Sequence, residues 1–413
     1  MKKWIVAPLL AALTMSGLTW VGSGAPAGAA KSLTTANPFR VFSPVDRTGA
    51  DASIGQFWST GLNAAVKYVN AHGGVMGKKV VVTYKDTQSN AQTATTITTN
   101  ALSSGKFQMV IPTAAAASGP PILQIAKRFK TLIIGASSVG NMGTGKAYPY
   151  AFVTNVSQPV QGLATACLAQ QTYHPKTVAY LYVKTTEWTY QTPQMARVWK
   201  KYGVKVVADE GYTFNATDVT PQVEKIQQAH PDVLIIGSFF QYLATAIKAI
   251  DALNYTVPVV GNAETSAGPP SSFLSSSTPF PKNSVEMQWK INARINTVLS
   301  PQQKQAQAAL TPTLKGNYPV AIATFLYTYD ALIYAQWAAD KAHSTSTPAM
   351  AKQLETLGKN KSANTGGLIA PNPGYTATTH WLQSALYPVD INGTFVKGTF
   401  PTTKGQPIAT CLK

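Results

Sequence analysis

The sequence predicts an α/β protein made of two doubly wound parallel-sheet lobes joined by a hinge of crossing strands. From residue 39 to residue 260, short apolar segments alternate with amphipathic segments of helical length, which is typical of parallel sheets with helices on both faces. The alternation is interrupted twice, at 136–157 and at 262–283, by stretches rich in Gly, Ser, Asn and Pro. We interpret these two interruptions as crossings between the lobes.

The first 30 residues have the pattern of a signal peptide. Two lysines precede an apolar stretch at 4–21, and Ala27 and Ala29 provide the small residues of a cleavage site. We expect cleavage near Ala29 and a mature protein outside the cytoplasm, in the periplasm or at the cell exterior. A retained membrane anchor is the alternative, and the Pro-, Gly- and Ala-rich end of this segment argues against it.

Eight segments between residues 39 and 261 have the length and composition of strands. They are short, apolar and mostly rich in Val, Ile or Tyr, as buried strands are. The expected strands are 39–43, 79–85, 107–111, 131–135, 177–183, 204–209, 232–236 and 257–261. A further strand-like run at 151–154 lies inside the first interruption.

Helices are expected between these strands. The segment 55–70 places its apolar residues on one stripe. Asn90 is a good N-cap for a helix over 91–103, which Gly105 would end. Two prolines open a helix over 120–130, and Thr220 followed by proline predicts an N-cap and a first helical residue.

The C-terminal part of the chain has a different pattern. A strongly apolar helix is expected over about 319–342. Two short strand-like runs, 386–389 and 394–397, flank the dipeptide Asn392-Gly393. Because Asn-Gly favours the tight turn of a hairpin, we expect an antiparallel hairpin here.

The charge balance is basic because carboxylates are scarce. The chain has 34 Lys and Arg against 16 Asp and Glu, a formal net charge of +18. The longest basic runs are pairs of lysines, and no aromatic–basic pattern accompanies them, so we expect no nucleic-acid partner. We interpret the scarcity of carboxylates as adaptation to acid, since native carboxylates that must be protonated destabilise a protein on acidification.

The two cysteines, Cys167 and Cys411, occur in a chain expected to be exported. A disulfide between them can persist outside the cytoplasm and would attach the C-terminal tail to an early helix of the second lobe. Two unrelated free thiols are the alternative.

Signals for catalysis, metals and cofactors are weak throughout the sequence. The run Gly140 to Lys146 fits a phosphate loop but lacks the following hydroxyl, and Tyr-Pro-Tyr replaces the helix that should follow. No G-x-S-x-G elbow occurs, and the five histidines are scattered without zinc spacing. The only adjacent pair of acids is Asp209-Glu210. We therefore expect a protein that is not an enzyme and that binds no cofactor and no metal.

One run of residues resembles a known family. The segment 61–79, GLNAAVKYVNAHGGVMGKK, is similar to the start of the type 1 periplasmic binding proteins. It resembles most the leucine/isoleucine/valine-binding branch of the ABC-transporter solute receptors. Later matches keep the family's order: a strand leading to Asp86, the helix with Tyr327-Thr-Tyr-Asp-Ala331, and Thr-Thr-His380. The resemblance covers about residues 39–400.

The resemblance implies how the chain is divided into lobes. The N-terminal lobe would contain 31–153 and about 286–364, and the C-terminal lobe 154–285 and about 365–413. Such proteins close on a ligand that is held at strand ends and helix N-termini.

The resemblance also implies a function. The expected protein is the extracytoplasmic solute-binding component of an ABC importer, which captures an amino acid or a related small carboxylate or amide. Its partner would be the membrane permease, and the protein would be a monomer. A ligand-sensing receptor domain of the same fold is the main alternative, and an extracellular enzyme on this scaffold is the third.

The family pattern places candidate binding residues on both lobes. First-lobe hydroxyls and backbone N–H groups would hold the anionic end of the ligand, although alanines replace four positions at 114–117. In the second lobe, one aromatic from 188–190 and one from 239–240 would cover the ligand, and an acid would pair with its ammonium group. The expected site consists of Thr113, Ala115, Ala116, Ser118, Ser137, Ser138, Trp188, Tyr190, Phe239, Phe240 and Glu264.

Overall fold

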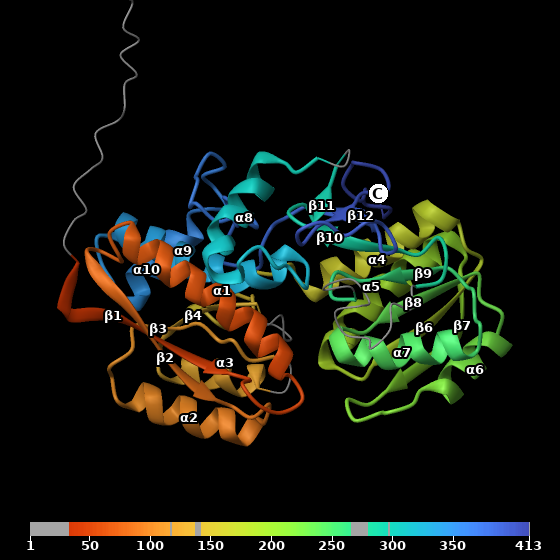
Figure 1. Cartoon of the computed structure of the whole chain (residues 1–413), viewed down its shortest axis with the longest axis horizontal. Coiled ribbons are helices and arrows are strands. Elements are labelled where there is room, and N and C mark those ends of the chain that lie inside the picture. The colour runs from red at the N-terminus through yellow and green to blue at the C-terminus, as the bar shows by residue number, and fades with distance from the viewer. Residues whose placement is uncertain (1–32, 116–117, 137–141, 266–279, 296–297, 413) are drawn as a thin grey trace, which may run out of the picture.

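The computed structural model describes residues 33–115, 118–136, 142–265, 280–295 and 298–412. These residues form two α/β halves that lie side by side, each built around its own sheet (Figure 1). The predicted fold class is confirmed. No helix in this part of the chain has the length and apolarity that a bilayer span requires.

The first sheet has five strands, all parallel to their neighbours. In spatial order they are β2 (Lys78–Asp86), β1 (Thr34–Val45), β3 (Met109–Val110), β4 (Leu132–Gly135) and β5 (Ala151–Val153). Adjacent residues of β1 face opposite sides of the sheet: Val41 packs in one apolar cluster with Leu62, and Phe42 packs in another with Ile122. Helices therefore cover both faces.

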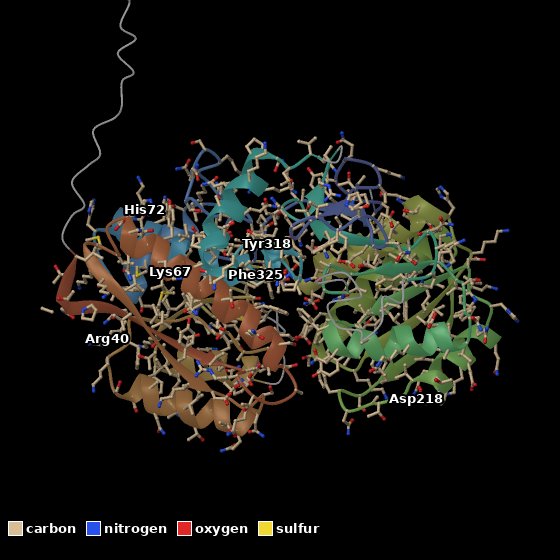
Figure 2. The ribbon with its side chains drawn as sticks, in the orientation of Figure 1. Arg40, Lys67, His72, Asp218, Tyr318 and Phe325 are labelled. Carbon is tan, nitrogen blue, oxygen red and sulfur yellow. A yellow bond between two sulfur atoms is a disulfide. The ribbon has the colours of Figure 1, made fainter. Side chains whose placement is uncertain are left out.

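The helices of the first half come from the two ends of the chain. On one face, α1 (Ala52–Ala71) packs against α9 (Ile322–Ala342), which carries Phe325 (Figure 2). The ring centroids of Phe325 and Phe57 are 5.7 Å apart. On the other face lie α2 (Ala91–Ser103) and α3 (Gly119–Arg128). Two further helices, α8 (Pro301–Leu314) and α10 (Thr347–Glu355), pack beside α1 and α9.

The second sheet has six strands, of which only the edge strand β12 is antiparallel to its neighbour. Their order is β12 (Leu386–Asp390), β10 (Val285–Trp289), β9 (Val259–Gly261), β8 (Val233–Gly237), β6 (Thr177–Val183) and β7 (Lys205–Tyr212). The accompanying helices are α4 (Gln158–Tyr173), α5 (Thr186–Tyr202), α6 (Thr220–Gln228) and α7 (Phe240–Ala252). A two-stranded sheet of β11 (Ala293–Arg294) and β13 (Phe400–Pro401) adjoins this half.

The eight predicted strands between residues 39 and 261 are confirmed, with shifts at their ends. The N-cap of α2 is also confirmed, because the Asn90 side chain accepts hydrogen bonds from the N–H groups of Gln92 and Thr93. The predicted cap of α6 is wrong by one residue. Thr220 is the first helical residue, and its N–H group donates to the Asp218 carboxylate at 2.9 Å.

Two predictions about chain connections are wrong. The interruption at 262–283, of which 266–279 lies outside the described residues, is not followed by a crossing, because the next strand, β10, still pairs with β9 in the second sheet. The chain reaches α8 only after β10. The hairpin about Asn392-Gly393 does not form either, since β12 pairs with β10 and residues 394–397 form no strand.

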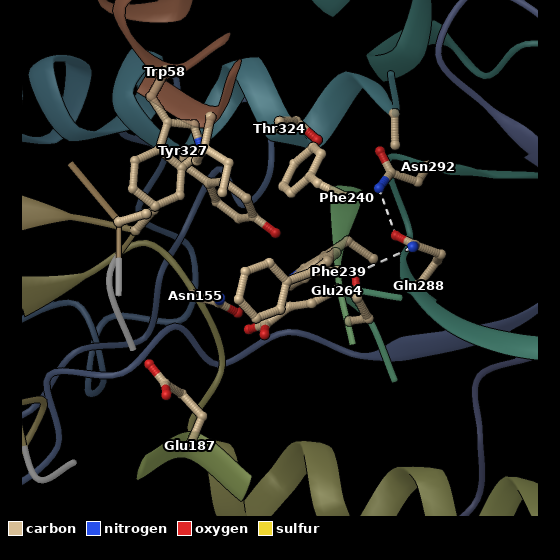
Figure 3. Close-up of a pocket in the computed structure, with 16 residues that line it drawn as sticks. Trp58, Asn155, Glu187, Phe239, Phe240, Glu264, Gln288, Asn292, Thr324 and Tyr327 are labelled. Atoms are coloured by element: carbon tan, nitrogen blue, oxygen red, sulfur yellow. Dashed lines mark hydrogen bonds between the residues drawn. The ribbon is translucent and has the colours of Figure 1, made fainter. Parts of the chain in front are cut away.

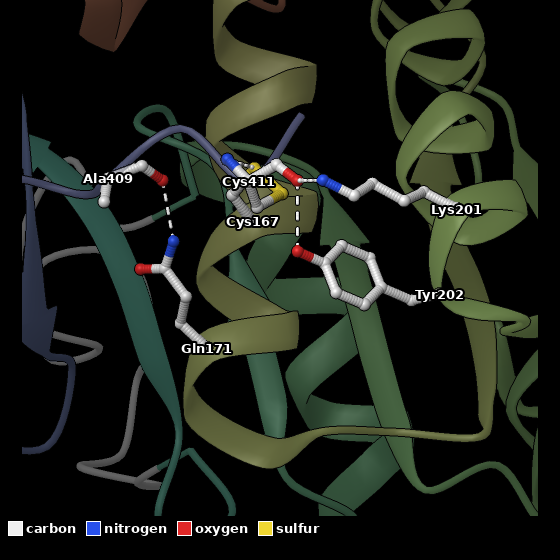
Figure 4. The surroundings of a disulfide bond; sticks show 6 residues. All are labelled: Cys167, Gln171, Lys201, Tyr202, Ala409 and Cys411. Carbon is white, nitrogen blue, oxygen red and sulfur yellow. Dashed lines mark hydrogen bonds between the residues drawn. A yellow bond between two sulfur atoms is a disulfide. The ribbon is translucent and has the colours of Figure 1, made fainter. Parts of the chain in front are cut away.

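The predicted disulfide between Cys167 and Cys411 is present. It joins the C-terminal tail to α4, and neighbouring side chains hold the tail further (Figure 4). Lys201 and Tyr202 both donate to the Cys411 carbonyl, at 2.9 and 3.0 Å, and Gln171 donates to the Ala409 carbonyl at 2.6 Å. The tail is therefore fastened to α4 and to the end of α5.

Candidate functional site

A cavity lies between the two halves and encloses about 720 Å³ of space including its mouth. Its lining residues come from α1, from the loops after β3, β4, β5, β8 and β9, and from the first turns of α5 and α7. Others come from β10, the loop after it, α9 and the residue before α9. The walls are formed by Ile54, Trp58, Ala115, Ala136, Asn155, Glu187, Phe239, Phe240, Ala263, Glu264, Gln288, Trp289, Asn292, Ala321, Thr324 and Tyr327 (Figure 3). Both halves therefore contribute to one site.

The position of the cavity follows from the topology. The carboxyl ends of parallel strands share one edge of a sheet, so the loops that follow them converge there. Ala115, Ala136 and Asn155 follow strands of the first sheet, and Phe239 and Glu264 follow strands of the second. The two edges face each other across the cavity.

Glu264 is one of the two charged residues in the described lining. Its Oε1 atom accepts long hydrogen bonds from the side-chain amides of Gln158 and Gln161, at 3.4 and 3.5 Å. Burial raises the pKa of Glu264 to about 7, and the negative charge of Glu187 adds to this rise. The carboxylate has neutral donors but no cationic partner among the described residues.

Glu187 is the second charged residue of the lining and lies in the first turn of α5. Burial raises the pKa of its carboxyl, although hydrogen bonds at the helix N-terminus act in the opposite direction. Figure 3 shows its carboxylate turned toward the same space as that of Glu264. Two carboxylates thus face one cavity.

Aromatic side chains form much of the remaining wall. The Tyr327 ring meets Trp58 and Trp289 edge-on, with ring centroids 6.4 and 5.4 Å apart. Phe240 stacks on Phe57 of α1 at 6.0 Å. Tyr327 is 8% exposed, and its hydroxyl points into the cavity (Figure 3) without a hydrogen-bond partner in the described part of the chain. The indole N–H of buried Trp289 also has no partner there.

The loop after β3 is held by an internal carboxylate. Asp46, which is fully buried at the end of β1, accepts from the Ala115 N–H at 2.6 Å and from the Ser118 hydroxyl at 3.0 Å. The Thr87 hydroxyl donates to the same carboxylate. Thr113 is buried as well, with its hydroxyl 3.0 Å from that of Ser43. These polar groups are engaged within the protein.

The structure brings four of the predicted site residues together and places others elsewhere. Ala115, Phe239, Phe240 and Glu264 line the cavity, whereas Thr113 and Ser118 do not. Ala116, Ser137 and Ser138 lie outside the described residues.

The predicted aromatic at 188–190 lies outside this cavity. Trp188 is buried, stacks on Tyr182 at 4.6 Å and covers Gly237 at the end of β8, where a Cβ atom would lie 2.2 Å from the indole ring. Tyr190 is 39% exposed on the surface of α5. Trp188 packs against the second sheet instead of lining the cavity, because Gly237 has no side chain and leaves room for the indole ring.

Three important lining residues were not predicted: Trp58, Glu187 and Tyr327. Two of them lie in segments that the sequence had already singled out, since Glu187 directly precedes Trp188 and Tyr327 is the first residue of the run Tyr327 to Ala331 that resembles the family. Asp330 of that helix has a structural role, because its carboxylate accepts from the N–H groups of Leu368 and Ile369 at 2.7 and 2.8 Å.

Hydrogen bonds join the two halves beside the cavity. The Tyr242 hydroxyl of α7 donates to Asp51, the residue before α1, at 3.0 Å. The Gln241 side chain donates to the Ala50 carbonyl at 2.6 Å. Burial raises the pKa of Asp51 to about 6, with the charge of Asp46 contributing.

Neither a metal cluster nor a phosphate loop is found among the described residues. No group of three or more His, Cys, Asp or Glu side chains there could hold a metal ion. The run that resembles a phosphate loop is described from residue 142 onward, and turns rather than a helix connect it to β5. It therefore offers no helix N-terminus to a phosphate.

A family model described as periplasmic binding protein matches residues 43–395. The leucine-, isoleucine-, valine-, threonine- and alanine-binding protein of Pseudomonas aeruginosa is 22% identical over 225 residues, 53% of this chain and 60% of that protein. The leucine-specific-binding protein of Salmonella typhimurium is 21% identical over 201 residues, 49% of this chain and 54% of that protein. The chain thus matches little more than half the length of these relatives.

Solved structures share the fold over nearly the whole chain. The isoleucine-bound branched-chain amino acid transporter substrate binding protein of Streptococcus pneumoniae has a TM-score of 0.71 at 18% identity, covering 88% of this chain and 97% of its own. A leucine binding protein of Thermotoga maritima has a TM-score of 0.72 at 16% identity, covering 85% and 95%. A fatty acid ABC transporter substrate-binding protein from Thermomonospora curvata has a TM-score of 0.71 at 15% identity, covering 92% and 94%.

Proposed function

Because this chain belongs to the periplasmic binding protein family, in its leucine-binding-protein-like type 1 branch, we propose that it is the extracytoplasmic solute-binding protein of an ABC importer. It captures a small solute between two lobes and presents it to a membrane permease. The relatives named above are binding proteins, and the proposed role includes no covalent chemistry.

The lobes we propose follow the two sheets. The N-terminal lobe contains 31–153 and the helices α8 to α10, to about residue 364. The C-terminal lobe contains the segment from residue 154 and about 365–413. The first segment of the C-terminal lobe ends after Trp289 rather than near residue 286, because β10 pairs within the second sheet.

The proposed ligand class is an amino acid or a related small carboxylate or amide. The observation that carries it is the position of Glu264 in a cavity walled by both halves and rich in aromatic rings. A carboxylate without a cationic partner suits an ammonium group or an N–H donor of a ligand. Trp58, Phe239 and Phe240 would cover the apolar part of the solute, and Ala115 would form part of the opposite wall. We keep Ala116, Ser137 and Ser138 among the proposed binding residues because of their positions in the family pattern of the sequence.

Thermal unfolding of the mature protein with a panel of amino acids, amides and small carboxylates tests this function. A ligand at 100 times its Kd stabilises the folded state by about 2.7 kcal/mol, which raises Tm by a few degrees. We expect at least one member to do so. Cells that lack the gene should then lose high-affinity uptake of that solute. No stabilisation by any member of the panel would contradict the proposed ligand class.

A further inference from the structure

The charged residues in the described lining of the cavity are all acidic. Glu187 and Glu264 line it, while no Lys, Arg or His belongs to the described lining. The internal segments outside the described residues contain no charged residue or histidine in their sequence. A chain with 34 basic and 16 acidic residues thus has only acids among the charged residues that line this space.

Three more carboxylates lie near the cavity. Asp46 accepts from the N–H group of the lining residue Ala115, Glu286 accepts from the side-chain amide of the lining residue Gln288, and Asp51 directly precedes α1. Five of the 16 acidic residues are therefore gathered around one cavity: Asp46, Asp51, Glu187, Glu264 and Glu286. Like charges held close together in a poorly solvated space repel each other, so a cation placed among them is favoured.

The described part of the site carries no positive charge for the anionic end of a zwitterion. In the loop after β3, the Ala115 N–H and the Ser118 hydroxyl donate to Asp46 instead of to the cavity. The side-chain donors of the described lining are neutral: the Tyr327 hydroxyl, which points into the cavity (Figure 3), the Thr324 hydroxyl, and the amides of Asn155, Gln288 and Asn292. They suit a carbonyl or amide oxygen, whereas a carboxylate would add a third negative charge beside Glu187 and Glu264 without a compensating positive one in the described lining.

We infer that the solute is a small organic cation, an amine or a guanidine with an apolar body, that lacks a free carboxylate. This inference rests on the proposed importer function and changes its ligand class, because an amine or guanidine without a carboxylate is neither an amino acid nor a small carboxylate or amide. The cationic end lies between Glu187 and Glu264, and the aromatic rings of Trp58, Tyr327 and Trp289 surround the rest of the ligand. Aromatic faces attract cations as well as apolar groups, so the same walls serve both ends.

Matched pairs of solutes, each an amino acid and its decarboxylated amine, test the inference by isothermal titration at pH 7.5. The pairs are leucine with 3-methylbutylamine, phenylalanine with 2-phenylethylamine, and arginine with agmatine, and 4-methylpentanoate serves as the anionic probe. We expect at least one amine to bind tenfold or more tightly than its amino acid, and the anion not to bind. If an amino acid or the anion binds as tightly as the matching amine, the inference is overturned while the proposed function stands. If no probe binds, both fail.

A substitution tests the role of Glu264 separately. Glu264→Gln keeps the shape of the side chain, and we expect it to weaken binding of the amine at least tenfold. The control Glu224→Gln changes an exposed acid of α6 and should leave the affinity unchanged. Equal affinity in the wild type and Glu264→Gln would overturn the assignment.

The pH dependence of the affinity distinguishes an electrostatic role from a structural one. Burial raises the pKa of Glu264 to about 7, so the wild type should lose affinity for the amine as the pH falls from 8 to 6. The Glu264→Gln variant should lose much less over the same range. Identical pH profiles for the two proteins would contradict the role of this charge.

Discussion

Asp46 determines what the loop after β3 can offer to a ligand. Its carboxylate accepts hydrogen bonds from the backbone of Ala115 and from the hydroxyls of Ser118 and Thr87. Burial raises its pKa, and these donors act in the opposite direction. The loop is thereby held against the end of β1, and the donors of Ala115 and Ser118 are engaged by Asp46.

Replacing Asp46 with Asn tests this role. The substitution turns one accepting oxygen into an N–H donor, which must then face either the Ala115 N–H or the Ser118 hydroxyl. We expect Asp46→Asn to lower the free energy of unfolding by about 1–3 kcal/mol, measured by denaturant titration. Asp251→Asn, at an exposed acid of α7, should change it by less than about 0.5 kcal/mol. Equal stability of both variants would argue against a buried network.

The candidate site was predictable from the sequence only in part. Glu264 could be predicted from the family pattern, and it lines the cavity. Glu187 could not, because its neighbour Trp188 is the more conspicuous residue in the same polar turn. The choice between them depends on Gly237, a residue 49 positions away that makes room for the indole ring. Such a long-range contact has no local signal in the sequence.

At the scale of elements, α1 and α7 connect the two halves beside the cavity. The Tyr242 hydroxyl at the start of α7 donates to Asp51 at the start of α1, and Phe240 stacks on Phe57. Asp51 is buried. If the lobes separate to admit a solute, these contacts must break, so their strength contributes to the affinity for the ligand.

Tyr242→Phe removes the hydrogen bond and leaves the Asp51 carboxylate buried without this donor. A loss of about 1–2 kcal/mol in the closed state corresponds to a roughly 5- to 30-fold increase in the apparent Kd. Tyr255→Phe is the matched control, because the Tyr255 hydroxyl has no partner among the described residues. Isothermal titration with the tightest-binding probe should separate the two variants. Wild-type affinity in Tyr242→Phe would show that this contact does not contribute to closure.

The elements of the fold were predicted better than their connections. The strands between residues 39 and 261 have strong local signals, because each is a short apolar run between helical segments. The hairpin about Asn392-Gly393 had a local signal too, but β12 pairs instead with β10, about a hundred residues earlier. Here β12 pairs over five residues with β10, which was already part of the second sheet, instead of with the short run that follows the turn. No strand was predicted at the position of β10. The second crossing between the lobes was therefore predicted before this strand instead of after it.

At the scale of the whole molecule, few charges stabilise the fold by pairing. Among the described residues, Lys225 and Glu210 form an ion pair, and His380 lies 3.3 Å from Glu355 but carries a charge only when it is protonated. Several carboxyls are instead buried with raised pKa values. Burial raises the pKa of Asp51 to about 6 and that of Asp330 to about 7. Protonation of such groups favours the folded state, which agrees with the interpretation of an acid-adapted protein.

The free energy of unfolding should therefore rise as the pH falls from 7 to about 4. In this range the folded state binds more protons than the unfolded state, whose carboxyls titrate near pH 4. The buried His380 opposes this trend, since burial lowers its pKa. Below pH 4 the trend reverses, because hydrogen bonds lower the pKa values of Asp86, Asp218 and Asp232. Urea titrations between pH 3 and 8 check this curve, and a steady loss of stability from pH 7 to pH 5 would contradict it.

The most direct test of the account is a crystal structure of the protein with the tightest-binding amine of the panel. The central claim is that the cavity between the two sheets is the binding site and that its carboxylates recognise a cation. We predict the ligand nitrogen within hydrogen-bond distance of the Glu264 carboxylate and the apolar body against Trp58, Tyr327 and Phe240. A ligand bound outside this cavity, or one whose nitrogen points away from both Glu264 and Glu187, would contradict the claim.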